Sequence, residues 1–347
     1  MIVDDYIEPA VLTGFVREVP HPYQLILNRF LPDRQINDIE AAFNQVQRTN
    51  RAAQFRAWDS ETPVGQRDQL SQSKIKLPPL GIKTPIGEYE RLTLERIRTG
   101  GDNRNGYVTA IYDDAEINTR SVYNRMELAR GDVLQDGKFT LSGENGLTIE
   151  ADFGLPAEHQ VSAGTVWSDH DDASPLQDLK AWTDAYLDTN GELPGTMLTS
   201  KTVVNNLLLS GEIRQLFYRG DAIGGGGPNL ITPMQLNQVL QAYGLPEIVT
   251  YDTRIEVDGV NTRVIDQDKV MLLPTDPQAL GFTAWGITAE ALELAAGQNP
   301  ALSFEELPGL VGVVMKEGDP LRVWTKVGAV GMPMLVQPRL LFVADVL

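Results

Sequence analysis

Four consecutive polar residues near the middle of the chain, Asp169, His170, Asp171 and Asp172, are potential ligands for a divalent cation. Carboxylates and an imidazole are ligand types that such ions accept. Their spacing matches no calcium-binding loop, however. Acidic side chains just before Pro175 are also favourable without a metal, because they lie at the positive end of a helix dipole. We therefore interpret these residues as the approach to a helix and predict no metal site.

A run of four glycines, Gly224 to Gly227, is a second feature that suggests chemistry. Glycine-rich loops hold phosphate with backbone N–H groups, but a complete phosphate-binding loop continues with Lys-Ser or Lys-Thr. Neither pair follows here, so we interpret the run as a surface loop.

Other catalytic chemistry has little support in the sequence. The chain has no cysteine, which excludes disulfides, thiolate nucleophiles and Cys-based zinc sites. No nucleophile motif accompanies His21 or His159, and no G-x-S-x-G elbow is present. The sequence predicts no catalytic residue, no cofactor and no enzymatic activity. A soluble acidic enzyme whose site forms only in three dimensions stays open as an alternative.

A long segment without regular periodicity, Ala52 to Glu90, is the most unusual part of the chain. Connections of this length inside a compact domain are uncommon and are normally disordered or functional. This one contains apolar side chains, which a disordered linker has little reason to hold. Residues Gln54–Trp58 and Ser73–Leu77 alternate and could pair as a long hairpin. Such an arm needs a neighbouring subunit to lie on.

Charge supports the same interpretation. Between Arg48 and Arg91 there are eight Lys or Arg against five Asp or Glu, whereas the whole chain has a net charge of −18. A basic arm and an acidic body favour docking of one copy on another, because complementary potentials raise encounter rates and fix register. The candidate inter-subunit contact residues are Arg56, Trp58, Arg67, Lys74, Lys76 and Lys83.

Composition limits the remaining classes. A chain of 347 residues is long enough for about two domains. No apolar run approaches the roughly 18 residues of a membrane span, and the first residues lack the features of a signal peptide, so we expect no membrane contact and a cytosol-like compartment. A pI near 4.6 argues against nucleic-acid binding by phosphate neutralisation.

Local signals predict an α+β fold. A long helix is expected over Asp113–Gln135, opened by Asp113 and ended by Gly137, followed by a hairpin of Lys138–Ser142 and Leu147–Phe153. Asp33 opens a short helix, or the chain pauses at Pro32. Further helices are expected from Pro175 to Asn190, Ser200 to Leu209, Glu212 to Tyr218 and Thr232 to Gly244, and strands at Thr196–Thr199, Glu247–Glu256, Asn261–Leu273, Arg322–Val327 and Arg339–Ala344.

Three stretches of the sequence carry a family resemblance. LQDGKFTLSGENGLTIEADFG followed by AGTVWSD, from Leu134 to Asp169, resembles the lambda-like major capsid protein E family of tailed bacteriophages, and so does the ending DPLRVWTKVGAVGMPMLVQPRLLFVADVL. LNRFLPDRQINDIEAAF with QFRAWDSETPVGQRD is similar to capsid proteins of phages that infect actinobacteria. The order of elements also resembles the Hong Kong 97 capsid fold.

The resemblance implies an organisation. Residues 1–47 would be an N-terminal arm, 48–90 an extended E-loop, 91–173 with 305–347 a peripheral domain, and 174–304 an axial domain. Copies of the chain would form hexamers and pentamers of an icosahedral phage head around double-stranded DNA, assembled in the host bacterial cytoplasm, without sequence-specific DNA binding.

The resemblance also implies partners. A separate scaffolding protein, a portal and, as in many relatives, a small decoration protein would accompany the shell. In some relatives an E-loop lysine forms an isopeptide bond to an asparagine of a neighbouring subunit, assisted by a glutamate. No matching asparagine and glutamate are identified for Lys74, Lys76 and Lys83, so noncovalent contacts are expected and a covalent cross-link is the alternative. An encapsulin-like nanocompartment shell, which shares the fold but encloses enzymes, is the main alternative.

Overall fold

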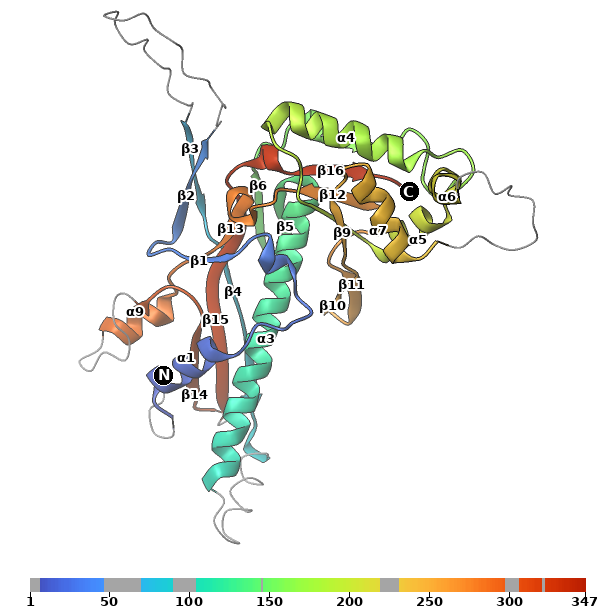
Figure 1. The fold of residues 1–347 in the computed structure, drawn as a ribbon. Coiled ribbons are helices and arrows are strands. Elements are labelled where there is room, and N and C mark those ends of the chain that lie inside the picture. Colours follow the sequence, from blue (N-terminus) through green and yellow to red (C-terminus); the bar gives the residue numbers. More distant parts are fainter. Residues whose placement is uncertain are drawn as a thin grey trace, which may run out of the picture. The chain divides into compact units, whose positions relative to one another are not determined.

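Figure 1 shows the computed structural model of the chain. The chain forms two compact units. Unit 1 comprises Met1–Ala41, Ile75–Arg130 and Phe282–Pro333, and unit 2 comprises Ala42–Lys74, Gly131–Gly281 and Met334–Leu347. The described residues are 7–46, 70–89, 104–144, 146–218, 231–296, 306–319 and 322–347. Among them no helix is both long enough and apolar enough to span a bilayer.

Unit 1 is built on a five-stranded sheet with the order β1-β13-β15-β14, in which β4 also pairs with β15. β1 runs parallel to β13, whereas β4 and β14 both run antiparallel to β15. Parallel pairing of β1 and β13 joins segments that lie far apart in the sequence. The strands are β1 (Asp33–Gln35), β4 (Pro79–Ile86), β13 (Gly281–Trp285), β14 (Val311–Glu317) and β15 (Arg322–Leu335).

A long helix, α3 (Arg104–Asp136), packs on this sheet. Asn118 ties the two together: its Oδ1 accepts from the Thr84 hydroxyl at 2.9 Å and its Nδ2 donates to the carbonyl of Thr325 at 3.0 Å. The expected helix is confirmed but begins earlier, so Asp113 lies inside it rather than at its N-terminus. Gly137 ends it as expected, with φ at +72° and its N–H bonded to the Val133 carbonyl.

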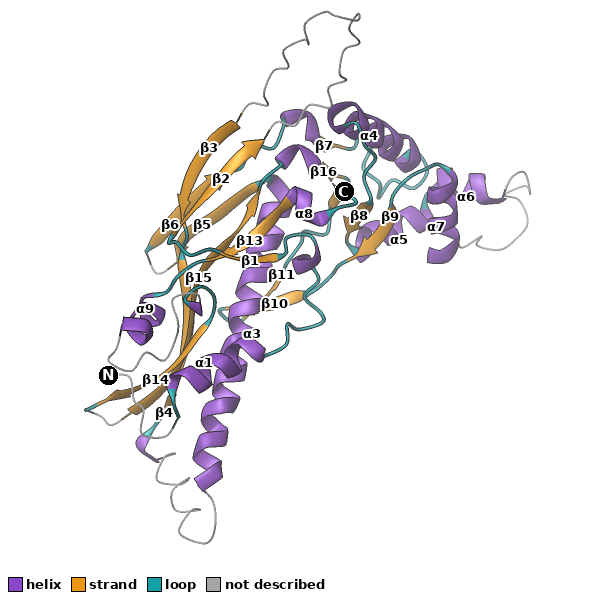
Figure 2. Cartoon of the chain, turned by 60° about the vertical axis from the view of Figure 1, so that its left-hand side comes forward, coloured by secondary structure: helices purple, strands orange, loops and turns teal. Residues whose placement is uncertain are grey.

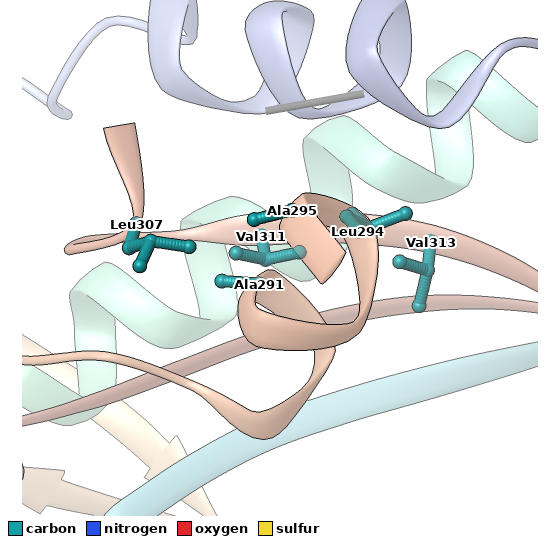
Figure 3. Packing of buried hydrophobic residues seen from close by; sticks show 6 residues of the cluster. All are labelled: Ala291, Leu294, Ala295, Leu307, Val311 and Val313. Atoms are coloured by element: carbon teal, nitrogen blue, oxygen red, sulfur yellow. The ribbon is translucent and has the colours of Figure 1, made fainter. Parts of the chain in front are cut away.

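Two short helices, α1 (Pro9–Glu18) and α9 (Ala289–Ala296), cover β14. The α9 side holds an apolar cluster of Ala291, Leu294, Ala295, Leu307, Val311 and Val313 (Figure 3). On the α1 side, Thr13 Oγ1 donates to the Gly312 carbonyl at 3.0 Å. Arg17 donates to three backbone carbonyls, those of Glu306, Pro308 and Leu310. The N-terminal segment is therefore fastened to unit 1 over its first helix.

Unit 2 contains a second sheet, with the order β7-β16-β12-β8-β9, and several helices gathered beside it (Figure 2). Trp182 of α4 stacks on Trp167 with ring centroids 5.7 Å apart and faces Phe342 of the sheet at 6.3 Å. The elements are β7 (Gln160–Ser162), α4 (Pro175–Asn190), β8 (Thr196–Thr199), α5 (Lys201–Leu209), α6 (Gly211–Tyr218), α7 (Pro233–Ala242), β9 (Glu247–Thr250), β12 (Lys269–Leu273), α8 (Pro277–Leu280) and β16 (Phe342–Asp345).

Unit 2 also contains two hairpins. β5 (Lys138–Glu144) and β6 (Leu147–Asp152) pair antiparallel, as the sequence predicts. β10 (Arg254–Val257) and β11 (Val260–Arg263) meet at a two-residue turn whose residues Asp258 and Gly259 both have positive φ. That conformation is the one such tight hairpins require.

A two-stranded ribbon lies outside both five-stranded sheets. It pairs β2 (Glu40–Val46) with β3 (Leu70–Lys76). The strand expected at 73–77 is therefore present. Among the described residues its partner is β2, whereas the sequence predicted pairing with residues 54–58. Residues 54–58 lie outside the described residues.

Several sequence predictions were wrong in detail. Asp33 begins strand β1 instead of a helix, because its backbone pairs with β13 and its carboxylate is held by distant side chains. The turn expected at Asp258 and Gly259 is present, but the strands expected over 247–256 and 261–273 are each interrupted, at residues 251–253 and at residues 264–268. Residues 338–340 form a 3-10 turn before β16.

Helix capping was predicted correctly at some positions only. Thr232 and Gln235 form the predicted capping box of α7, and Ser200 caps α5 by accepting from the N–H of Val203. Ser174 makes no side-chain cap for α4. There the Leu176 N–H donates to the carboxylate of Glu212 instead, at 2.8 Å.

Candidate functional site

The lysines expected to contact a neighbouring copy lie on two strands with different surroundings. Lys74 and Lys76 are exposed on β3, and Lys83 is exposed on β4 in the sheet of unit 1. The other candidates, Arg56, Trp58 and Arg67, lie outside the described residues.

Lys83 already has a contact within its own subunit. Its ammonium group lies over the ring of Trp324, 4.2 Å from the centroid. Trp324 in turn donates through Nε1 to the carboxylate of Glu317 at 2.9 Å. A cation over an exposed indole contributes about 0.5–1 kcal/mol. Lys83 therefore belongs to a small polar group on the sheet surface of unit 1.

The chain enters and leaves the β2–β3 ribbon through two segments of unit 1, residues 38–41 and 75–78, which we call the ribbon root. The Leu77 N–H donates to the carbonyl of Ile39 at 3.0 Å, so the two chain segments are bonded to each other. Asp38 Oδ1 accepts from the N–H groups of Ile39 and Glu40 at 2.7 and 3.3 Å. Leu77 is buried against the body of unit 1.

A second group of polar residues is buried in unit 1 and surrounds Arg130, whose side chain is fully buried. Arg130 donates to Asp33 Oδ1 at 2.6 Å, to Thr283 Oγ1 at 2.9 Å and to Glu127 Oε2 at 3.2 Å. The other oxygen of Glu127 accepts from the backbone N–H of Leu27 at 2.8 Å. This network joins the N-terminal segment, helix α3 and strand β13.

Two neighbouring rings extend the Arg130 network. His21 Nε2 lies 3.5 Å from Arg130 Nη1, and its ring packs at 4.7 Å from the ring of Tyr123. Burial and the charge of Arg130 lower the pKa of His21, although Asp33 and Glu127 act in the opposite direction. Burial also raises the pKa of Tyr123. In the neutral imidazole, His21 Nε2 therefore faces the guanidinium group of Arg130 as a hydrogen-bond acceptor.

This network was not among the features predicted from the sequence. Its members come from three regions of the chain, and Arg130 lies 97 residues from Asp33 and 153 from Thr283. One signal was available: Arg130 and Glu127 fall on the same helix beside the buried residues Met126 and Val133. Charged residues at such positions are almost never fully buried unless they are paired.

The acidic run at 169–172 behaves as a local turn. His170 Nε2 lies 2.9 Å from Asn206 Oδ1, and the Asp172 N–H approaches Asp169 Oδ1 at 3.4 Å. Over the described residues, no group of three or more His, Asp or Glu side chains is arranged to hold a metal ion. The glycine run at 224–227 lies outside them.

Comparison with known families identifies the chain. The family model for phage major capsid protein E matches residues 8–346, which is nearly the whole sequence. The chain belongs to this family. The capsid protein is thus a structural component of a phage particle and not an enzyme, as the sequence analysis predicted.

Solved structures are similar in fold to the capsid protein. A protein assigned as a prophage capsid protein of Escherichia coli matches with a TM-score of 0.61 and 17% identity over 100% of both chains. A phage-related protein of Bordetella bronchiseptica matches with a TM-score of 0.53 and 14% identity, over 96% of this chain and 95% of the other. The fold is the α+β capsid fold expected from the sequence.

An encapsulin of Synechococcus elongatus is less similar to the capsid protein. Its TM-score is 0.41 at 12% identity, over 94% of this chain and 90% of the other, which is too low to support an argument. No curated protein sequence gave a significant match.

Proposed function

We propose that copies of this capsid protein assemble into hexamers and pentamers that close into an icosahedral head around double-stranded DNA. The observation that carries the proposal is the family match over residues 8–346. Each contact between copies can be weak, because one subunit that engages several neighbours gains from a high effective concentration once the lattice closes.

The proposed division of labour follows the chain. Residues 1–47 serve as an N-terminal arm, and residues 48–90 as an extended loop that lies on a neighbouring copy. Residues 91–173 with 305–347 form the peripheral domain, and residues 174–304 form the axial domain at the capsomer centre. Strands β2 and β3, which pair with each other outside both larger sheets, support the idea of a projecting element.

Charge supports both the contacts and the contents of the shell. The exposed lysines Lys74 and Lys76 lie on β3, within a basic segment of a chain whose net charge is −18. An acidic neighbour attracts such a segment. The same acidity disfavours tight phosphate binding by the wall, so we propose enclosure of DNA without sequence-specific contacts.

Assembly in the host cytoplasm would involve other proteins. We propose a separate scaffolding protein, a portal at one vertex and a decoration protein on the outer surface.

The test is the assembly state of the purified protein. Light scattering and negative-stain images, recorded with and without coexpressed scaffolding protein, should reveal capsomers and closed shells, and particles from infected cells should contain double-stranded DNA. Stable monomers under every condition would refute the proposal. Shells loaded with a protein cargo instead of DNA would refute the phage-head assignment and favour a nanocompartment.

A further inference from the structure

We propose that the ribbon root is held rigidly in a socket within unit 1, and that Gly286 is the residue that positions it. This inference rests on the proposed function, since the ribbon would carry the loop that contacts a second copy. The positions of residues 38–41 and 75–78 would then determine where every loop starts in the shell.

Hydrogen bonds fasten the root on two sides. The Gly331 N–H donates to the carbonyl of Pro78 at 3.1 Å, which ties the end of the ribbon to β15. Leu77 and Ile39 bond to each other across the root, as described above. The Gly286 N–H donates to the Val330 carbonyl at 2.7 Å. Gly286, which directly follows β13, is therefore itself hydrogen-bonded to β15.

Close packing leaves the root no free space at Gly286. A Cβ added there would lie 2.6 Å from the carbonyl oxygen of Asp38 and 2.8 Å from Cδ1 of Leu77. Both distances are shorter than real Cβ contacts. The Leu77 contact involves the end of a flexible side chain, but the Asp38 contact involves backbone of the root. A residue larger than glycine at position 286 must therefore displace the root itself.

Gly331 makes a second close approach within unit 1. Its added Cβ would lie 2.5 Å from the carbonyl oxygen of Ala284 and 3.1 Å from Cε3 of Trp285. That contact joins β13 to β15, so it does not fix the root directly. Gly286 is consequently the more selective position for a test.

The first measurement uses the unassembled full-length chain and limited trypsin digestion. The bond after Lys76 is protected in the native chain because the N–H of Leu77 is bonded and its side chain is 6% exposed. Gly286→Ala should accelerate cleavage after Lys76 about tenfold or more, because cleavage follows the population of the opened root. Digestion at Lys201, on helix α5 of unit 2, should be unchanged.

Two variants serve as controls for the digestion. Gly318→Ala adds the same methyl group in unit 1 where nothing lies within 4 Å, and should digest like the native chain. Val313→Ala removes core volume from the apolar cluster beside α9, which contains no residue of the root, and should not produce selective cleavage after Lys76. Selective cleavage in Val313→Ala, or its absence in Gly286→Ala, would overturn the proposal that Gly286 positions the root.

A double variant and a cap variant sharpen the test. Leu77→Ala added to Gly286→Ala should not restore protection, because the contact with the Asp38 carbonyl remains. Full restoration would overturn the assignment to backbone displacement. If Gly286→Ala does not fold, Asp38→Ala takes its place: it removes the carboxylate that accepts from Ile39 and Glu40 and should also raise cleavage after Lys76 selectively. Native-like protection in that variant would overturn the proposal.

The second measurement is the yield and shape of assembled particles. Gly286→Ala should reduce the fraction of regular closed shells at least severalfold, whereas Gly318→Ala should match the native yield. Faster cleavage with native shells would show that the socket exists but does not position the loop, and would overturn the inference. Failure of the native chain to assemble would refute the proposed function, while the digestion results would still decide whether the socket exists.

Discussion

Arg130 donates to the carboxylate of Asp33 at 2.6 Å, although 97 residues separate them in the sequence. Strand β1, which begins at Asp33, is thereby tied to the long helix α3, and Trp285 Nε1 donates to the same oxygen at 2.7 Å. The side chain of Arg130 is fully buried, and its positive charge is compensated by the carboxylates of Asp33 and Glu127. The N-terminal segment is held to unit 1 by a buried polar network as well as by apolar packing.

Removing one partner from this network should cost far more than removing a surface ion pair. Arg130→Met leaves Glu127 buried without its cation, and we expect a loss of about 3–5 kcal/mol in unfolding free energy. Arg120→Met, which breaks the exposed pair with Glu116, should cost about 0.5 kcal/mol or less. Urea unfolding of both variants measures the difference. Equal losses of unfolding free energy would contradict a larger contribution from the buried pair.

The docking of α1 on β14 should depend on Gly312. Its added Cβ would lie 2.7 Å from Cγ2 of Val16 and 3.3 Å from Cγ of Leu12. Gly312→Ala should therefore destabilise the chain by about 1–3 kcal/mol, the usual cost of overpacking. Thermal unfolding checks this against Gly318→Ala, where a Cβ has open space. A native melting temperature for Gly312→Ala would show that α1 is not packed on the strand as described.

Acid should destabilise unit 2 through His159. This side chain is fully buried, its Nδ1 bonds to the Leu341 carbonyl at 2.9 Å, and its Nε2 has no hydrogen-bond partner among the described residues. Burial lowers the pKa of His159 below its usual value of about 6.5, so in mild acid the folded state keeps the neutral ring while the unfolded chain takes up a proton. Stability is therefore complete above about pH 6.5 and falls as the pH drops below it.

The variant His159→Gln tests this dependence. Its unfolding free energy should change less between pH 7 and 5 than that of the native chain, by up to about 1.4 kcal/mol for each unit by which the pKa is lowered. His170→Gln is the matched control, since His170 is only partly buried and bonds to Asn206. An unchanged pH slope in His159→Gln would contradict a neutral buried imidazole.

Lys83 allows folding and assembly to be separated. Lys83→Met removes the cation over Trp324, which should reduce subunit stability by about 0.5–1 kcal/mol. If Lys83 also contacts a neighbouring copy, shell formation should fall by more than this loss explains. Parallel measurement of unfolding and particle yield compares the two. A yield that simply follows stability would restrict Lys83 to its own subunit.

Local signals in the sequence predicted local structure well. The hairpin at 138–152 and the capping box at Thr232 depend on neighbouring residues, and both are present. Long-range pairing was not predictable in the same way. Residues 79–86 lie within the range expected for the loop, yet they form β4 because β15 pairs with them over its register from Val323 to Val330.

The same reason explains which functional features were missed. Strand β1 and the carboxylate of Asp33 depend on partners at residues 130 and 285, so the sequence near Asp33 indicated only a helix start or a pause at Pro32, and no strand. The tight contact at Gly286 depends on the carbonyl of Asp38, and a glycine in sequence gives no indication of its distant neighbour. The family resemblance, by contrast, extends along most of the chain and was confirmed by the match over residues 8–346.

The most direct measurement is a reconstruction of the assembled particle at a resolution that traces the chain. We predict a closed shell in which residues 48–90 of each copy lie against a neighbouring copy, with the basic side chains near acidic ones. We also predict that Trp58→Ala weakens shell cohesion more than it weakens folding of the single chain. A shell in which this segment contacts only its own subunit, or equal losses of folding and cohesion, would contradict the account.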